Sequence, residues 1–264
     1  MSIQKMSGQV RRLSVDDPAY REAFEVFLAG TDEKEVTHAC LASVARRLPQ
    51  RRTYLDVGPA DGTTTRHLSR LFERTLCIEP GDHMQEPLRR NCPDALVLRE
   101  PVQEARVRTP VDLALLSHVL YYLPRPQWLP TLLRVLGWVR PAGQAVVLLQ
   151  NPDNACMRMV RRFTGTRFDL AELAGELREA GSPLVGETRI ETLPVRYRTT
   201  SLDEAVTVAE FHLSVPELGP GASLPSRSEL ADYVRRHFAG PQGGFTMPHA
   251  QDLLHVTRPA TAPG

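Results

Sequence analysis

Three features are missing from this sequence, and each absence excludes a class of protein. No run approaches 18 consecutive apolar residues, and the first residues contain no apolar signal-peptide core, so we expect neither a membrane span nor secretion. The formal net charge of +1 gives no overall field to attract nucleic acid or an anionic membrane. Cysteines are few and far apart, without C-x-x-C or His/Cys metal spacing (Cys40, Cys77, Cys92 and Cys156). We therefore expect free core thiols in a cytoplasmic protein without a metal, a monomer or weak dimer whose partner is a small molecule.

Lysine is also nearly absent, since only Lys5 and Lys34 occur and the other 30 of the 32 basic residues are arginine. With 22 prolines, this bias is typical of a GC-rich bacterial genome and carries no chemistry. The 264 residues, 42% of them hydrophobic and 24% charged, fit one large globular enzyme domain. A chain of this length buries roughly 70% of its unfolded surface, which allows a substantial core.

The first fifty residues show the spacing of amphipathic helices. Residues 1–15 are expected to form an arm. Asp16-Asp17-Pro18 then begins a helix whose apolar face carries Tyr20, Phe24, Phe27 and Leu28. Gly30-Thr31-Asp32 ends this helix, and a second helix runs to about Leu48.

From Thr53 onward, short apolar strands alternate with helical segments. Strands are predicted at 54–57, 75–78, 95–98, 111–116 and 144–149, with helices at 62–72, 82–90 and 127–139. This alternation indicates right-handed βαβ units and a parallel sheet that is covered on both faces. After Gln150 we expect two helices within 153–181, strands at 187–197 and 245–257, and helices at 202–211 and 226–237. The predicted class is α/β, a doubly wound, mostly parallel seven-stranded sheet with an N-terminal and C-terminal helical cover. Its one integrated domain divides into arm and cover helices (1–52), a ligand-binding core (53–150) and a segment completing the sheet and cover (151–264).

A glycine-containing loop, Asp56-Val57-Gly58-Pro59-Ala60-Asp61-Gly62, follows the first predicted strand. Ligands of doubly wound folds bind at the carboxyl ends of parallel strands, where this loop is placed. Gly58 permits a tight turn, the small Ala60 lets the backbone approach a ligand, and Gly62 opens the next helix. The alternative is an ordinary strand–helix turn, because glycine is common in such turns.

Glu79 strengthens the ligand-binding interpretation. It ends the second predicted strand, 21 residues after Gly58, where a doubly wound fold places the carboxylate that binds a ribose diol. The spacing D-x-G-x-x-x-G differs from the dinucleotide pattern G-x-G-x-x-G, and Asp61 within the loop would repel a pyrophosphate. These features favour a cationic nucleoside with an amino-acid tail, such as S-adenosylmethionine, over a nicotinamide cofactor.

The loop is similar to the first motif of the class I S-adenosylmethionine-dependent methyltransferases, and residues 53–150 resemble their Rossmann-like fold. The resemblance implies that Val102 and Gln103 contact adenine and that Ser117 and His118 lie against the methionine moiety. It gives the full set of expected cofactor contacts: Asp56, Gly58, Ala60, Asp61, Gly62, Glu79, Pro80, Met84, Val102, Gln103 and Ser117. The implied product is S-adenosylhomocysteine, and no metal is implied. The Asn/Asp-Pro-Pro-aromatic motif of DNA amino-methyltransferases is absent after the fourth strand.

Two further segments resemble the histamine N-methyltransferase-like subfamily. The helix from Tyr20 to Leu28 followed by Thr31-Asp32-Glu33 is similar to that family's N-terminal helix and its amine-binding glutamate. The run His118-Val119-Leu120-Tyr121-Tyr122 resembles its Gln-x-Leu-Tyr-Tyr segment. The resemblance implies substrate contacts by Tyr20, Phe24, Tyr121, Tyr122 and, in the last strand, His249. His118 stands where the family has glutamine and His249 where it has asparagine. The family's tryptophans are missing from 151–164, so we expect a substrate other than histamine.

Glu33 and His118 are the predicted catalytic residues, Glu33 as an amine anchor or proton acceptor and His118 as a base beside the methyl donor. Each candidate also has a structural alternative: Glu33 at a helix terminus, His118 and His249 satisfied by backbone, Tyr20 and Phe24 as packing residues. The predicted function is methyl transfer to a small aromatic or amine-bearing metabolite, with N-methylation in secondary metabolism favoured. C-methylation of an indole at C3 and O-methylation remain open, as do a nicotinamide oxidoreductase and a non-catalytic cofactor-binding module.

Overall fold

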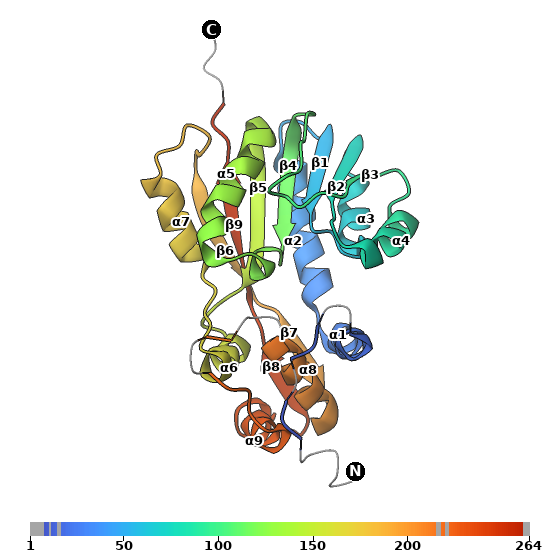
Figure 1. The fold of residues 1–264 in the computed structure, drawn as a ribbon, viewed down its shortest axis with the longest axis vertical. Coiled ribbons are helices and arrows are strands. Elements are labelled where there is room, and N and C mark those ends of the chain that lie inside the picture. Colours follow the sequence, from blue (N-terminus) through green and yellow to red (C-terminus); the bar gives the residue numbers. More distant parts are fainter. Residues whose placement is uncertain (1–7, 11, 15–16, 215–217, 220–221, 261–264) are drawn as a thin grey trace. The chain divides into compact units, whose positions relative to one another are not determined.

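The computed structural model describes residues 8–10, 12–14, 17–214, 218–219 and 222–260 (Figure 1). Most of the predicted arm, together with Asp16, lies outside these residues. The described residues form two compact units. The sheet unit consists of Lys34–Leu149, Asp169–Leu193 and the described residues of 252–264. The helical unit consists of Gln150–Phe168 and the described residues of 1–33 and 194–251.

The sheet unit is built around a seven-stranded sheet in the order β3-β2-β1-β4-β5-β9-β6. Its strands are β1 (Thr53–Val57), β2 (Arg74–Ile78), β3 (Leu96–Leu98), β4 (Val111–Ser117), β5 (Val139–Gln150), β6 (Thr188–Leu193) and β9 (Gln251–Thr257). β1 pairs in parallel with both β2 and β4, so that Leu55 is aligned with Leu76 on one side and Ala114 on the other. β2–β3 and β4–β5 are also parallel. The mostly parallel, doubly wound sheet confirms the predicted fold class. Strand order reverses between β1 and β4, which marks the ligand-binding crevice of such sheets.

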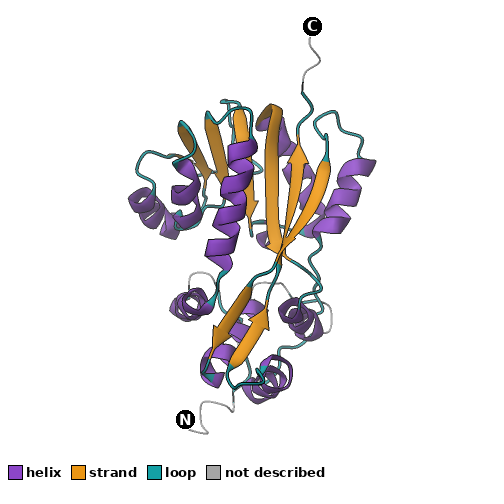
Figure 2. Ribbon diagram, turned by 180° about the vertical axis from the view of Figure 1, so that it is seen from behind, coloured by secondary structure: helices purple, strands orange, loops and turns teal. Residues whose placement is uncertain are grey.

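Helices cover both faces of this sheet. They are α2 (Glu33–Arg47), α3 (Thr63–Ser69), α4 (Asp82–Asn91), α5 (Trp128–Trp138) and α7 (Leu170–Glu179), with α5 on one face and α2 on the other (Figures 1 and 2). Coverage on both sides explains why β1 and β4 are almost wholly buried and why their sequences are continuous rather than alternating apolar runs. Leu55, Leu113 and Leu115 are fully buried at the centre.

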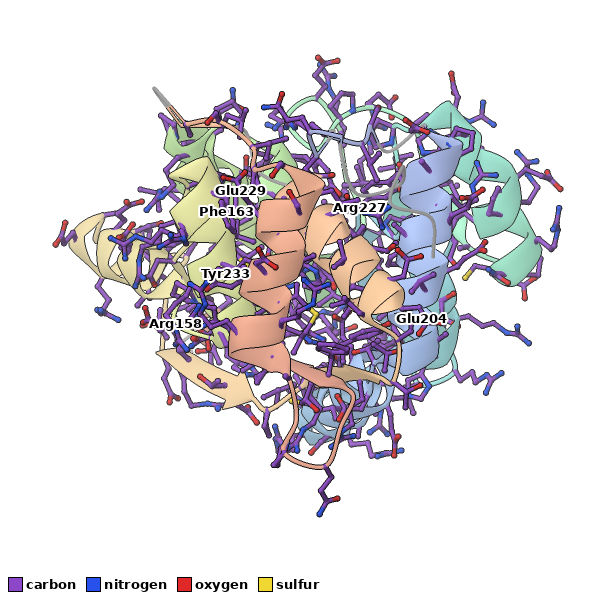
Figure 3. The ribbon with its side chains drawn as sticks, turned by 90° about the horizontal axis from the view of Figure 1, so that it is seen from below. Arg158, Phe163, Glu204, Arg227, Glu229 and Tyr233 are labelled. Carbon is purple, nitrogen blue, oxygen red and sulfur yellow. The ribbon has the colours of Figure 1, made fainter. Side chains whose placement is uncertain are left out.

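The helical unit contains α1 (Pro18–Gly30), α6 (Ala155–Thr164), α8 (Leu202–Ser214), α9 (Arg227–Phe238) and a two-stranded antiparallel ribbon of β7 (Arg196–Thr199) and β8 (Phe245–Pro248). Asp17 caps α1 by accepting a hydrogen bond from the Ala19 amide at 2.9 Å. Helix α8 packs against α1, α6 and α9. Tyr233 of α9 meets Phe163 of α6, with ring centroids 5.5 Å apart (Figure 3).

Arg227 joins α9 to α8 in the same unit (Figure 3). Its guanidinium lies 3.1 Å from an Asp203 oxygen and 3.2 Å from a Glu210 oxygen, and only 20% of its side chain is exposed. Burial raises the pKa of Glu210, while Arg227 lowers it. The guanidinium therefore compensates a largely buried carboxylate at the packing surface of two helices.

Two predicted strands are each divided in the structure. The segment 187–197 becomes β6 and β7, which are separated at Pro194, and 245–257 becomes β8 and β9, which are separated at His249 and Ala250. Pro194 has no N–H for a sheet ladder, so the strand breaks there. The His249 amide donates to Val195 O at 3.0 Å, which holds the two breaks together. In addition, β5 begins five residues earlier than predicted, and its pairing with β4 shifts register between Val111 and Leu113.

The four cysteines are free thiols, three of them buried and Cys40 half-buried. Burial raises the pKa of each thiol, which favours the unreactive protonated form. Within the described residues, no helix has the length and hydropathy to cross a membrane. In that same part of the chain, no group of three or more His, Cys, Asp or Glu side chains could hold a metal ion.

Candidate functional site

The loop between β1 and α3 has a backbone that few residues could adopt. Gly58, Ala60 and Gly62 have positive φ angles of 68°, 51° and 81°. A Cβ on Gly58 would lie 2.6 Å from Val119 Cγ2, and a Cβ on Gly62 would lie 2.7 Å from Leu88 Cδ1. The positive φ angles therefore favour glycine at both positions, and a side chain at either would have to displace a neighbouring side chain.

Glu79 is bound directly to this loop. Its Oε2 accepts a hydrogen bond from the Ala60 amide at 3.1 Å, and its Oε1 accepts one from the Gly81 amide at 2.9 Å. The Glu79 amide donates to Leu98 O at 2.9 Å, and Gln85 Nε2 donates to Glu79 O at 2.7 Å. Each carboxylate oxygen can accept about two hydrogen bonds, so a fixed carboxylate retains capacity for the two hydroxyls of a ribose. Gln85 was not among the predicted site residues, because its burial on the largely polar helix α4 is seen only in the structure.

Two other acidic residues of the motif are engaged within the protein. Asp56 is 2% exposed, and its Oδ2 accepts the hydroxyls of Tyr54 and Thr65, each at 2.7 Å, which ties β1 to α3. Burial raises the pKa of Asp56 to about 6, against the lowering effect of these hydroxyls. Asp61 accepts the Thr63 amide at 3.0 Å and its hydroxyl at 2.6 Å, at the start of α3. A direct contact of either carboxylate with a ligand stays a prediction.

His118 follows β4 with a φ of 60°, a left-handed conformation that is uncommon for residues other than glycine. Its amide donates to Leu148 O at 2.9 Å, and its half-buried ring stacks on Tyr121 with centroids 5.7 Å apart. Neither tyrosine of the Leu-Tyr-Tyr run belongs to the core: Tyr121 is half-buried and Tyr122 is 56% exposed, whereas Leu120 is buried. The fold therefore places these rings at the carboxyl end of β4, as expected.

The remaining predicted cofactor residues are spread over the same edge of the sheet unit. Pro80 is exposed, Met84 and Ser117 are half-buried, and Val102 is buried. Gln103 is exposed and lies with its Nε2 3.4 Å from Gln127 Oε1. Their contact with a ligand stays a prediction.

The helical unit brings together two residues predicted to act on the substrate. His249 is fully buried, with Nε2 3.0 Å from Thr31 Oγ1 and 3.8 Å from Glu33 Oε2, and Nδ1 3.1 Å from Met247 O. The Thr31 hydroxyl oxygen also accepts a hydrogen bond from the Glu33 amide at 3.1 Å. Burial lowers the pKa of His249, and the Glu33 carboxylate opposes that effect.

Aromatic rings form a cluster on one side of His249. Phe27 lies 5.1 Å from the His249 ring and 5.6 Å from Phe211, between ring centroids. Tyr20 and Phe24, both half-buried, contact Phe211 at 5.2 and 5.7 Å. Phe211 was not predicted as a site residue, because nothing in its own helix shows that it meets rings from α1.

A hollow of about 500 Å³ lies at the opposite edge of the sheet unit from the glycine loop. It is lined by residues that precede β4 and by the junction of α5 with β5, among them Arg108, Trp138 and Arg140. Ligand sites of doubly wound sheets lie at the carboxyl ends of the strands, so this hollow is not the expected site.

Solved structures share the fold. A candidate methyltransferase from Bacillus halodurans is 10% identical with a TM-score of 0.60, and the alignment covers 84% of this chain and 99% of that one. The N-methyltransferase NodS from Bradyrhizobium japonicum, solved in complex with S-adenosylhomocysteine, is 15% identical with a TM-score of 0.52, covering 92% and 100%. The sequence itself matches no protein-family model and no curated protein. The chain therefore has the Rossmann-like α/β fold of these methyltransferases.

Proposed function

We propose that this chain is an S-adenosylmethionine-dependent methyltransferase that methylates a small aromatic or amine-bearing metabolite, with nitrogen as the favoured acceptor. The observation that carries the proposal is the Glu79 carboxylate, fixed by the Ala60 and Gly81 amides beside the crevice where strand order reverses. A fixed anion next to a tight loop suits a neutral ribose diol and a cationic sulfonium. The same anion would repel the 2′-phosphate of a phosphorylated dinucleotide.

The residues present fit such a cofactor. The loop backbone is kept bare by Gly58 and Gly62, where a side chain would clash, and Asp61 lies within the loop where a pyrophosphate would bind. When bound, the cofactor supplies an electrophilic methyl group. The protein needs to orient the acceptor for in-line attack and to remove its proton.

The Glu33–His249 pair supports an amine-bearing substrate. Glu33 is 7% exposed and its Oε2 lies 3.8 Å from Nε2 of His249, whose ring packs against Phe27. A carboxylate favours an ammonium by charge, and an aromatic ring favours it by cation–π attraction. His118 at the carboxyl end of β4 is the proposed proton acceptor. We also propose that the chain is a member of the histamine N-methyltransferase-like subfamily and acts in secondary metabolism.

The first test is cofactor binding by isothermal titration calorimetry. We expect S-adenosylhomocysteine to bind and NADH not to bind. NADH binding without S-adenosylhomocysteine binding would instead indicate an oxidoreductase. Incubation with S-adenosylmethionine and a panel of amines, indoles and phenols should then release S-adenosylhomocysteine, and NMR of the product identifies the methylated atom. Cofactor binding without turnover on any acceptor would indicate a non-catalytic module.

The second test is Glu33→Gln. We expect at least a tenfold loss of turnover with the cofactor Kd unchanged, because glutamine keeps the size of the side chain and removes its charge. Glu35→Gln is the matched control, since Glu35 is exposed on the same helix. Unchanged turnover in Glu33→Gln would remove Glu33 from the catalytic residues.

A further inference from the structure

Lys34 lies in the first turn of α2, close to the end of the glycine loop. Its Nζ is 3.3 Å from the hydroxyl of Thr64, the second residue of α3. His38, one turn further along α2, has its Nε2 3.2 Å from the same hydroxyl. The Lys34 ammonium carries three N–H bonds, of which the threonine hydroxyl accepts one.

The charges around the loop are unevenly matched to the proposed cofactor. Asp56, Asp61 and Glu79 supply negative charge, which suits the sulfonium and the ammonium of the cofactor's amino-acid end. That end also carries a carboxylate, which needs a cation. The positive charge of Lys34 reaches the same loop, since it acts on Asp56 and favours its ionised form.

One neighbouring arginine of the sheet unit is engaged elsewhere, since Arg89 of α4 forms an exposed ion pair with Glu86 at 2.9 Å. Lys34 is also the one lysine in the described part of a chain that otherwise uses arginine. A compact ammonium on a flexible stem adapts to a single carboxylate next to a helix, where the wide guanidinium fork needs more room.

We propose that Lys34 binds the α-carboxylate of the cofactor's amino-acid end and so positions the methyl donor. This inference rests on the proposed function. Glu79 holds the nucleoside on the β2 side of the loop, and Lys34 holds the other end of the cofactor on the α3 side. Because the two contacts fix both ends of one extended molecule, together they orient the sulfonium between them.

The test compares two ligands that differ only by the amino-acid part. S-adenosylhomocysteine contains the α-carboxylate, and 5′-methylthioadenosine contains the same thionucleoside without it. By calorimetry, Lys34→Met should weaken S-adenosylhomocysteine binding at least tenfold, about 1.4 kcal/mol, and change 5′-methylthioadenosine binding less than twofold. Lys34→Arg should recover part of the lost affinity.

Arg70→Met is the matched control, because it removes an exposed positive charge just after α3. It should leave both affinities unchanged, and thermal midpoints should show that all variants are folded. Equal losses for both ligands, or no loss for S-adenosylhomocysteine, would overturn the role of Lys34. If the unmodified protein binds neither ligand, the proposed function itself is wrong, which is a distinct outcome. Should Lys34→Met not fold, Lys34→Gln provides the same comparison.

Discussion

Replacement of Glu79 by glutamine is the most direct probe of the proposed cofactor site. Each carboxylate oxygen accepts one backbone amide, from Ala60 at 3.1 Å and from Gly81 at 2.9 Å. Glutamine has one acceptor oxygen, so its NH₂ group must face one of these amides, and the loop loses an anchor. Hydrogen bonds to charged groups are worth about 1.5–3 kcal/mol, and neutral ones about 0.5–1.5 kcal/mol. With about 1 kcal/mol lost at each ribose hydroxyl, binding weakens by roughly 2 kcal/mol, or about thirtyfold.

The assay is calorimetric titration of Glu79→Gln with S-adenosylhomocysteine and with adenosine. Both ligands carry the ribose diol, so both should lose affinity by the same factor, in contrast to the selective loss expected for Lys34→Met. Glu73→Gln is the control, since Glu73 is exposed just before β2. A loss below threefold in a folded Glu79→Gln protein would refute the assignment of the ribose to Glu79. A loss confined to S-adenosylhomocysteine would place the carboxylate at the amino-acid end instead.

Three further predictions concern stability and are read from urea unfolding. Gly58→Ala should lower the free energy of unfolding by about 1–3 kcal/mol, because Gly58 has a φ of 68° and an added Cβ would lie 2.6 Å from Val119. Gly137→Ala in α5, where an added Cβ meets open space, should raise the free energy of unfolding by about 0.5–1 kcal/mol. Equal effects of the two substitutions would contradict the strain at Gly58. Because the pKa of Asp56 is raised from 3.8 to about 6, its protonated form favours folding below pH 3.8, and that contribution is lost as the pH rises through 6. The stability of Asp56→Asn relative to the wild type should therefore increase between pH 4 and 7, and a pH-independent difference would disprove the shift. Arg227→Met should lower the free energy of unfolding by about 1–2 kcal/mol, because it leaves the largely buried Glu210 carboxylate without its guanidinium. Arg235→Met removes one side of an exposed ion pair and should lower it by less than about 0.5 kcal/mol. Similar losses in the two variants would argue against a stabilising role of Arg227.

The parts of the fold that sequence predicts are those with local signals. The glycine loop and the acid at the end of β2 follow from spacing within a single βαβ unit, and the structure brings Ala60 and Glu79 into contact across 19 positions. The breaks at Pro194 and His249 were missed because each half continues an apolar strand pattern. What changes at the break is the partner strand, which is a tertiary property. Similarly, the left-handed backbone of His118 follows from its contacts with Leu148 and Tyr121 and has no sequence signature.

The proposed substrate site is harder to predict, because it joins positions 218 apart, as in the contact between Thr31 and His249. The contacts of His249 also separate the roles of the two candidate histidines. A carbonyl oxygen can only accept, so Nδ1, beside Met247 O, carries the proton of the neutral ring, and Nε2 then accepts the Thr31 hydroxyl. Burial lowers the pKa of His249 and so disfavours a second proton. We therefore expect His249 to position Thr31, whose hydroxyl oxygen in turn accepts a hydrogen bond from the Glu33 amide. The half-buried His118 is then the histidine suited to accept a proton from the substrate.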